Sequence, residues 1–439
     1  MDKEKIFSKL GIEELNLMQK ETADAVLHSS NDVIVLSPTG SGKTLAYLLP
    51  LAKRLSADVD EVQAVVIVPG RELAIQSQSV LANIGTGLRS MALYGGRPTM
   101  DEHRLIKKKL PQIIFVTPGR LNDHLDKGNF DTDKIEWIII DEFDKCLEMG
   151  FRDAVSKAIE RMRNAKRRIL LSATEAEEIP SFVNIGKASK LNFLFDDEQV
   201  SERVRINIVN SPVKDKLNTL QRLLRSFNDE STIVFLNFRE SVERVNDYLE
   251  KLGFSTTAFH GGFEQPQRET SLNKFSNGSS NILVATDLAS RGLDIPDVRN
   301  IVHYHLPLDE GAYIHRVGRT ARWEASGRTF FILNPDECVP DYVEGEQHEF
   351  NIPDRLPSPA PPKMITLYIG KGKKDKISKV DIVGFLCKKG GIDKKEIGRI
   401  DIKERYCKVA VSRRCVKEVL EKTQGEKVKG LKTLVQVVK

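Results

Sequence analysis

Short apolar runs, rich in β-branched residues, alternate with longer amphipathic segments through the first 350 residues of the chain. Continuous apolar runs of this kind are typical of parallel strands that helices cover on both faces. The first series of predicted strands comprises 33–37, 64–68, 113–117, 137–141 and 168–172. The second series comprises 233–237, 281–286, 300–305 and 329–333. Because a polar stretch around 196–202 separates the two series, the pattern predicts two tandem α/β domains, over 1–200 and 201–350.

A proline-rich stretch follows the second α/β region. Five prolines fall between residues 353 and 362, so the segment 351–362 is expected to be an extended spacer that makes no contacts itself. The elements predicted after it are strand 364–370, helix 378–389, strands 397–403 and 406–411, helix 413–423 and strand 432–438. This βαββαβ order predicts a small ferredoxin-like (RRM-like) domain over 363–439, a fold common among RNA-binding modules.

Charge is distributed unevenly along the chain. Residues 363–439 contain 22 Lys and Arg against 9 Asp and Glu, a net charge of +13. The preceding 362 residues contain 45 and 53, a net charge of −8. A basic terminal domain on an acidic body favours a polyanion such as nucleic acid as the partner, although a solvated lysine-rich surface has the same composition.

Membrane and secreted classes fit the sequence poorly. No apolar run approaches the length of a membrane helix, and the first ten residues lack the apolar core of a signal peptide. The five cysteines form no C-x-x-C pair, which favours neither a disulfide framework nor a zinc site. We therefore expect a cytoplasmic protein without membrane association. We also expect a monomer, although nothing in the sequence determines the oligomeric state.

The strongest chemical signal is SPTGSGKT at 37–44, between a predicted strand and a predicted helix. Backbone N–H groups at such a helix N-terminus can surround a phosphate, with Lys43 on the outer phosphates and Thr44 on Mg²⁺. A glycine turn with a surface lysine is the simpler alternative, but this spacing is rare by chance. The predicted nucleotide-binding residues of this loop are Ser37, Thr39, Gly40, Ser41, Gly42, Lys43 and Thr44.

A second signal, DEFD at 141–144, comes directly after the apolar strand WIII. Asp141 can hold Mg²⁺ through water, and Glu142 can orient and deprotonate an attacking water. A third, HRVGRTAR at 315–322, can present arginines to the charge that develops on a transferred phosphoryl group. Separately, the two segments could be a solvated acidic loop and an exposed basic helix. Together with the glycine loop they predict a nucleotide held between two domains and hydrolysed when they close.

These segments resemble the motifs of the DEAD-box RNA helicases of superfamily 2. The resemblance spans both α/β domains and implies that they are RecA-like. Further motifs similar to that family are Gln19, PGRELA at 69–74, Gly95–Gly96, TPGR at 117–120, SAT at 172–174, VFLNF at 234–238, QPQR at 265–268 and TDLASRGLD at 286–294.

The resemblance implies a role for each matching residue, with ATP and Mg²⁺ as cofactors. Gln19 would read adenine, Asp294 would contact the ribose, and Arg319 and Arg322 would act as arginine fingers. Asp144, Ser172, Thr174 and His315 would couple nucleotide state to domain closure. The residues implied to lie along the RNA backbone are Arg71, Gly96, Thr117, Gly119, Arg120, Gln265, Arg268 and Thr286.

The sequence departs from the family pattern at a few positions. Phe143 stands where the family has a small residue, Gly70 where it has Thr, and Ala321 where it usually has Gly. The charged groups expected to do chemistry are all retained. The short region before Gln19 puts the adenine contact in doubt more than it does hydrolysis.

Residues 364–376 and 424–439 resemble the C-terminal RNA-binding domain of DbpA-type helicases. That resemblance implies a structured site in 23S rRNA of the large ribosomal subunit. Tyr368 could stack on a base from the sheet, but the strand 405–411 lacks the second set of aromatic rings that this mode needs. We therefore expect the RNA contacts on the Lys-rich loops around 371–376 and 427–432 and on the arginines of the predicted helix 413–423: Lys371, Lys373, Lys374, Arg413, Arg414, Lys427 and Lys429.

The sequence thus predicts an ATP-dependent RNA helicase that remodels structured RNA, with 23S rRNA of the large-subunit precursor as partner during ribosome biogenesis. A general RNA helicase or chaperone without rRNA preference is one alternative. A DNA translocase with the same core and a non-enzymatic RNA-binding scaffold are two others. A 2′-OH requirement would exclude the translocase, and an ATPase assay with RNA would exclude the scaffold.

Overall fold

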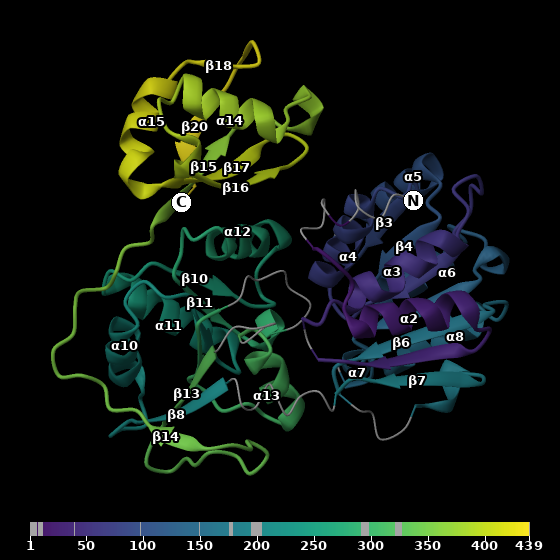
Figure 1. The fold of residues 1–439 in the computed structure, drawn as a ribbon, viewed down its shortest axis with the longest axis horizontal. Coiled ribbons are helices and arrows are strands. Elements are labelled where there is room, and N and C mark those ends of the chain that lie inside the picture. Colours follow the sequence, from purple (N-terminus) through teal and green to yellow (C-terminus); the bar gives the residue numbers. More distant parts are fainter. Residues whose placement is uncertain are drawn as a thin grey trace. The chain divides into compact units, whose positions relative to one another are not determined.

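The computed structural model describes residue 7 and residues 12–38, 40–96, 98–148, 150–174, 179–194, 204–290, 298–320 and 327–438. The chain forms two compact units, largely residues 1–203 and 204–439. Each unit contains a twisted parallel sheet with helices on both faces (Figure 1).

The sheet of the first unit has the described strands in the order β3-β4-β2-β5-β6-β1-β7, all parallel. The strands are β1 (Asp32–Leu36), β2 (Ala64–Ile67), β3 (Ser90–Leu93), β4 (Ile113–Val116), β5 (Trp137–Asp141), β6 (Arg167–Ser172) and β7 (Ala188–Asn192). The helices are α2 (Leu17–His28), α3 (Lys43–Arg54), α4 (Arg71–Ile84), α5 (Thr99–Lys109), α6 (Pro118–Asp126), α7 (Phe143–Glu148) and α8 (Arg152–Arg161).

Successive residues along the strands of this sheet pack into two separate hydrophobic cores, one on each face. Val33 and Val35 of β1 pack with α2, α3 and α4 on one face. On the other face, Val65 and Ile67 of β2 pack with α5, α6, α7 and α8. Both faces are therefore apolar, as successive strand residues point to opposite sides.

The second unit contains a sheet of the same kind in the order β10-β11-β9-β12-β13-β8-β14, also parallel throughout its described strands. Its strands are β8 (Val204–Asn210), β9 (Thr232–Phe235), β10 (Thr256–Phe259), β11 (Ile282–Ala285), β12 (Asn300–His303), β13 (Gly327–Leu333) and β14 (Gln347–Glu349). Its helices are α10 (Leu217–Ser226), α11 (Arg239–Lys251), α12 (Gln265–Ser276) and α13 (Glu310–Val317).

The C-terminal part of the second unit, which we call the tail domain (363–438), is an antiparallel sheet in the order β16-β17-β15-β20. The elements are β15 (Met364–Ile369), α14 (Lys379–Lys388), β16 (Ile397–Ile402), β17 (Cys407–Ser412), α15 (Val416–Thr423) and β20 (Val435–Val437). A short hairpin, β18 (Lys427–Val428) and β19 (Leu431–Lys432), precedes the last strand. One sheet face packs against α14 and α15 around Leu367, Ile369 and Val409.

The predicted fold class is confirmed, and the predicted strands are present with small shifts of their ends, except that the strand predicted over 432–438 is reduced to β20 (Val435–Val437). In the two parallel sheets, the strands β3, β7, β8, β10 and β14 were not predicted. The predicted helix 413–423 begins instead as a 3₁₀ turn at Arg413–Cys415, and α15 starts at Val416.

The expectation that the proline-rich spacer makes no contacts is wrong. Just before it, Phe350 packs edge-on against Phe330 at a ring-centroid distance of 5.3 Å. Farther along, Asn281 donates a hydrogen bond to the carbonyl of Ala360 over 3.2 Å, and Arg413 donates to that of Pro362 over 2.8 Å. Proline carbonyls remain acceptors even though the ring removes the donor, so an extended segment can still be held to a surface.

Within the part of the chain that the structure describes, every helix is too short or too polar to cross a membrane.

Candidate nucleotide and RNA sites

The glycine loop joins the carboxyl end of β1 to the N-terminus of α3, as the sequence predicts. Gly40 and Gly42 both have φ of +88°, a backbone region that disfavours other residues. The Lys43 side chain is 8% exposed and its ammonium donates to the carbonyls of Ser37 and Pro38. The loop therefore curls around its own lysine at a helix N-terminus, the arrangement that binds a phosphate chain.

Gln19 lies directly against this loop. Its Nε2 donates to the carbonyl of Gly42 over 3.3 Å, and a Cβ on Gly42 would come within 2.3 Å of that nitrogen. Asn16 caps α2 through the backbone N–H of Gln19 and also donates to the carbonyl of Ser41 over 2.9 Å. Asn16 was not predicted, although an N-cap asparagine three residues before a glutamine is a recognisable capping box.

The acidic motif comes at the carboxyl end of β5, and β6 separates this strand from β1. Asp141 is 3% exposed and accepts a hydrogen bond from the backbone N–H of Glu142 over 3.0 Å. Burial raises the pKa of Asp141 to about 6, against the opposing effect of the Lys43 charge. Glu142 adopts φ of +53°, a left-handed conformation that is strained for a side chain of this size. The turn thus places two neighbouring carboxylates at the end of β5.

The SAT segment follows β6 and contacts the acidic motif. The Thr174 hydroxyl donates to Asp144 Oδ2 over 3.1 Å, while Ser172 Oγ bonds to the backbone of Thr174. The backbone N–H of Ser37 donates to the carbonyl of Ser172 over 3.0 Å, so the same strand end also adjoins the glycine loop. The predicted coupling residues of the first unit are therefore in one hydrogen-bonded group with the loop.

Phe143, the departure from the family pattern, is 2% exposed and belongs to the apolar core beneath α6 and α8. The ring packs within that core. The larger side chain therefore fills core volume without taking the place of a charged group.

The donor set fits a hard cation beside a phosphate. Asp141 Oδ2 is buried without a hydrogen-bond partner among the described residues, and Thr44 at the start of α3 supplies a half-buried hydroxyl. Oxygen donors of this kind suit Mg²⁺, which supplies charge neutralisation for phosphate oxygens when bound. Lys43 would hold the outer phosphates, and Glu142 would orient a water and accept its proton.

In the second unit, Arg316 organises the strand ends. Its side chain is fully buried and pairs with Asp287 through two nitrogens, one at 3.0 Å. It also donates to Asn237 Oδ1 over 2.7 Å and to the carbonyl of His305 over 2.8 Å. Four segments far apart in sequence are thereby joined at one buried guanidinium. The segment HRVGRTAR was expected to present its arginines to a phosphoryl group, but Arg316 is internal and paired with Asp287.

The neighbouring motif residues are also buried. His315 is fully buried and Arg319 is 2% exposed, at the C-terminal end of α13. The backbone N–H of Arg319 donates to the carbonyl of Arg316, and the carbonyl of Arg319 accepts from the N–H of Val298, which fixes the turn after the helix. Three predicted site residues, Thr39, Asp294 and Arg322, lie outside the described residues.

The residues predicted along RNA fall into groups at strand ends and helix starts. Arg71 begins α4 and lies against Gly96, where a Cβ would meet its guanidinium at 2.8 Å. Thr117 is the N-cap of α6, and Gly119 is exposed in its first turn. Arg120, in contrast, is 6% exposed and turned inward.

The inward side chain of Arg120 donates to the carbonyl of Tyr94 over 3.2 Å and pairs with Glu102 at 3.4 Å. In the second unit, Arg268 is 3% exposed and donates to Gln265 Oε1 over 3.1 Å, and Thr286 follows β11.

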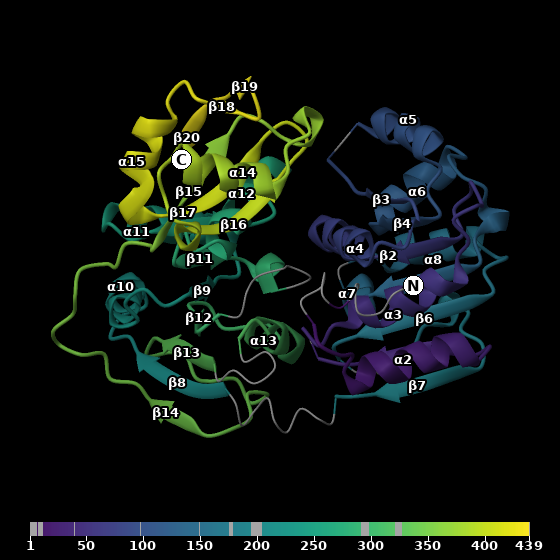
Figure 2. The same ribbon diagram turned by 45° about the horizontal axis from the view of Figure 1, so that its top comes forward.

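The predicted basic loops of the tail domain meet in space. Lys429 donates to the carbonyl of Lys376 over 2.9 Å and pairs with Asp381 at 3.3 Å, joining the 427–432 hairpin to the 371–376 loop. Figures 1 and 2 both show this hairpin at the side of the tail domain remote from α12. Lys373, Lys374 and Lys427 are exposed on the two loops.

The two arginines of the tail are held by other groups. Arg413 donates to the carbonyl of Pro362 over 2.8 Å. Arg414 forms two hydrogen bonds with Glu396, which hold the pKa of that carboxyl down at about 2. Both arginines lie in the 3₁₀ turn before α15 rather than on the helix.

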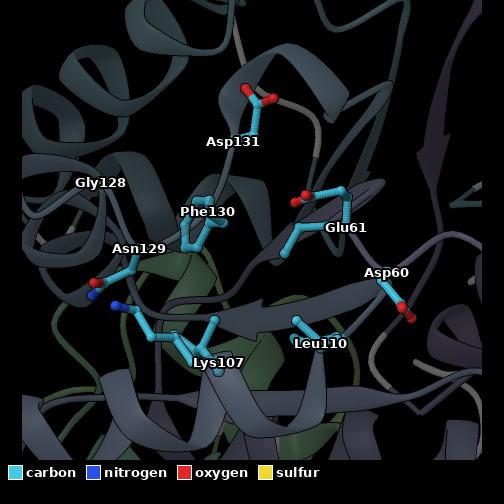
Figure 3. A pocket seen from close by; sticks show the side chains of 11 residues that line it. Asp60, Glu61, Lys107, Leu110, Gly128, Asn129, Phe130 and Asp131 are labelled. Carbon is cyan, nitrogen blue, oxygen red and sulfur yellow. The ribbon is translucent and has the colours of Figure 1, made fainter.

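A pocket of about 370 Å³ lies beside the amino ends of β2, β4 and β5, whereas the glycine loop and the acidic motif follow the carboxyl ends of their strands. Figure 3 shows Glu61, Lys107 and Phe130 among its lining side chains. Ligands of parallel α/β sheets bind at the carboxyl ends of the strands, so this pocket is separate from the nucleotide site.

Comparison with known proteins identifies three families along the chain. Residues 16–182 match the DEAD/DEAH box helicase family, 215–324 the helicase conserved C-terminal domain, and 366–437 the DbpA RNA binding domain.

Two curated relatives extend over almost the whole chain. The ATP-dependent RNA helicase DbpA of Escherichia coli is 33% identical, covering 98% of this chain and 96% of its own. The protein of the same name from Bacillus subtilis is 29% identical, covering 96% and 94%.

Among solved structures, Mss116p bound to single-stranded RNA and AMP-PNP is 26% identical with a TM-score of 0.71, covering 80% of this chain and 78% of its own. Dbp5 of S. cerevisiae bound to RNA and ADP BeF3 has a TM-score of 0.69 over 79% of this chain and 92% of its own, and at 24% identity it shows the shared fold alone. With the glycine loop, the paired carboxylates and the SAT contact in place, the chain belongs to the DEAD-box family and is an ATP-dependent RNA helicase of the DbpA type with a C-terminal RNA-binding domain.

Proposed function

We propose that this helicase remodels 23S rRNA in precursors of the large ribosomal subunit, in the cytoplasm and as a monomer. The tail domain would select the RNA, and the two RecA-like domains would unwind a duplex beside it. The observation that carries the proposal is the meeting of the two lysine-rich loops on one side of the tail domain.

The other face of the tail domain supports this choice of RNA surface. In the sheet register Tyr368 lies opposite Lys408, and Asp401 lies opposite Lys408 on the next strand, so these residues share the face away from α14 and α15. Lys408 on that face is 9% exposed and donates to Thr270 of α12 over 2.9 Å. A face already in contact with α12 is less accessible to RNA than the loops, which are exposed.

We propose the catalytic roles from the motifs, and the geometry of the described residues supports those of Lys43, Thr44, Asp141 and Glu142. Lys43 would hold the outer phosphates, Glu142 would be the general base, and Thr44 and Asp141 would hold Mg²⁺, which would neutralise charge on the phosphates. Arg319 and Arg322 stabilise charge on the γ-phosphate when the domains close. Gln19 and Asp294 bind the nucleoside.

Domain closure would link the nucleotide state to RNA binding. Asp144, Ser172, Thr174 and His315 would transmit nucleotide state to the RNA path. That path would include Arg71, Gly96, Thr117, Gly119, Gln265 and Thr286, whose contacts with phosphate and 2′-OH need no particular base sequence. Arg120 would act by positioning α6 and Arg268 by positioning Gln265, since both guanidinium groups are buried and held internally.

Equilibrium binding of a structured large-subunit rRNA fragment, against a scrambled RNA of equal length, tests the selection step. Changing Lys371, Lys373, Lys374, Lys427 and Lys429 to Gln should abolish the preference for the fragment. A matched variant with Lys388, Lys389, Lys394, Lys395 and Lys417 changed to Gln loses the same charge elsewhere on the domain and should keep it. If wild type binds both RNAs equally, the chain is a general RNA helicase without rRNA preference.

A further inference from the structure

Helix α12 carries the predicted RNA motif at its start and contacts the tail domain along the rest of its length. Gln265 and Arg268 form the first turn. Glu269, Asn273 and Asn277 follow at intervals of four residues, which places them along one side of a helix and its C-cap. This spacing separates an RNA-facing end from a stripe that faces the tail domain.

The stripe is bonded to the tail sheet by polar groups throughout. Lys403 pairs with Glu269 at 3.0 Å, and Asn273 donates to Asp401 over 2.6 Å. Asn277 donates to the Thr366 hydroxyl over 2.8 Å, in a buried position. In Figure 1, α12 lies next to the strands β15, β16 and β17, with α14 and α15 beyond them. The sheet face of the tail is therefore a docking surface for α12.

Glu269 connects this docking surface to Gln265 and Arg268 of the RNA motif. Glu269 accepts from Lys403 through Oε2 and from the Gln265 side chain through Oε1, over 3.0 and 3.4 Å. Gln265 in turn accepts from the buried Arg268 through its own Oε1 over 3.1 Å. The contacts run in sequence from Lys403 of the tail through Glu269 and Gln265 to Arg268.

We propose that Glu269 is a positioning residue that couples docking of the tail domain to RNA binding at the start of α12. With Lys403 in place, Glu269 and the buried Arg268 together fix the Gln265 amide, so that Gln265 has one preset orientation toward the RNA backbone. Loss of docking frees Glu269 and lets Gln265 rotate. This inference rests on the proposed RNA path but is independent of rRNA selection.

The direction in which one substitution changes RNA affinity distinguishes this coupling from a simple electrostatic effect. Removing a negative charge beside an RNA path should strengthen binding if Glu269 is only a surface acid. Coupling predicts the opposite, because Gln265 loses its acceptor and Lys403 loses its partner. Glu269→Ala should therefore weaken RNA binding.

The experiment is a double-mutant cycle in the full-length protein, with oligouridylate-stimulated ATPase activity measured against RNA concentration. Glu269→Ala and Lys403→Ala should each raise the half-saturating concentration roughly three- to tenfold, the coupling usual for contacting residues. The double variant should be no worse than either single one, and maximal turnover should stay within about twofold. Lys403→Arg should restore the wild-type value.

Lys389→Ala is the matched control, because Lys389 forms a similarly exposed pair with Glu426 at 3.2 Å, away from α12. It removes the same charge as Lys403→Ala and should change half-saturation less. Unchanged or tighter half-saturation in Glu269→Ala, or single effects that simply add, would overturn the coupling. A wild type that is stimulated by oligouridylate but does not prefer the rRNA fragment would contradict the proposed function alone.

Discussion

At the scale of single residues, the chemistry depends on the strained turn at the end of β5. Glu142 holds φ of +53° while its neighbour Asp141 accepts its backbone N–H. Such strain persists only where surrounding packing fixes it, here through the wholly buried strand β5. The turn therefore holds the two carboxylates next to each other at the end of β5, where we propose separate roles for them.

Glu142→Gln should lower ATP turnover by about 10²–10⁴-fold, because the amide cannot accept the proton of the attacking water. ATP and RNA affinity should persist, since Lys43 and Asp141 remain. The measurement is steady-state ATPase activity at saturating RNA. The same change at Glu136, an exposed residue before the other end of β5, should leave turnover unaltered. Turnover in Glu142→Gln close to that of wild type would mean that another group is the base.

Phe143→Ala should restore the small residue usual in the family but destabilise the first domain. The ring is 2% exposed in the core, and such truncations cost about 3–5 kcal/mol of unfolding free energy. Urea unfolding followed by tryptophan fluorescence measures the loss, and Phe151→Ala, at a half-buried position on the same core, should cost less. ATPase activity per folded molecule should change little. An unchanged unfolding midpoint would show that the core closes around the smaller side chain.

At the scale of elements, the tail domain is held by an ion pair between the 3₁₀ turn before α15 and the residue before β16. The hydrogen bonds from Arg414 lower the pKa of Glu396 to about 2, below the ordinary glutamate value. A depressed carboxyl pKa stabilises the fold above the ordinary pKa, and this contribution is lost as the pH falls towards 2.

Arg414→Ala should therefore destabilise the protein at neutral pH, and its deficit relative to wild type should shrink as the pH falls below about 5. Thermal unfolding of both proteins across that range measures it. Arg413→Ala is the control, because its partner is the carbonyl of Pro362, which does not titrate. Equal pH dependence in the two variants would assign the effect to some other carboxyl.

Elements with continuous apolar runs could be predicted from the sequence, and those without could not. β1, β5 and β9 are fully or mostly buried and were found. β7 and β14 are edge strands with half-exposed or polar residues, so periodicity offers no signal for them. In β8, Arg205 and Asn207 interrupt the apolar residues, and we did not assign this mixed pattern to a strand.

The candidate site residues also divide into those that the sequence could predict and those that it could not. Spacing along the chain revealed the glycine loop and the acidic motif, because their residues are close in sequence. The Arg316–Asp287 pair and the inward turn of Arg120 depend on packing between segments far apart, which no local pattern carries. Lys429 and Lys376 likewise meet only in the folded tail domain.

At the scale of the whole molecule, the excess positive charge and the nucleotide-binding motifs lie in different parts of the chain. The tail carries +13 and the rest of the chain −8, so long-range attraction for RNA is concentrated in the tail. Changing the five loop lysines named above to Gln should reduce the slope of log affinity against log salt by about 0.7 for each phosphate that the variant no longer neutralises. RNA binding titrations at several salt concentrations measure this slope. A slope equal to that of wild type would place the phosphate-binding groups elsewhere.

The most direct test of the account is ATPase activity against concentration of the structured rRNA fragment and of its scrambled counterpart. The full chain should reach half-maximal activity at a lower concentration of the fragment. A chain that ends at residue 362 should lose this difference while keeping maximal turnover at saturating RNA, because the nucleotide site lies in the RecA-like domains. If the shortened chain still discriminates between the two RNAs, recognition belongs to the core, and the tail domain does not select the substrate.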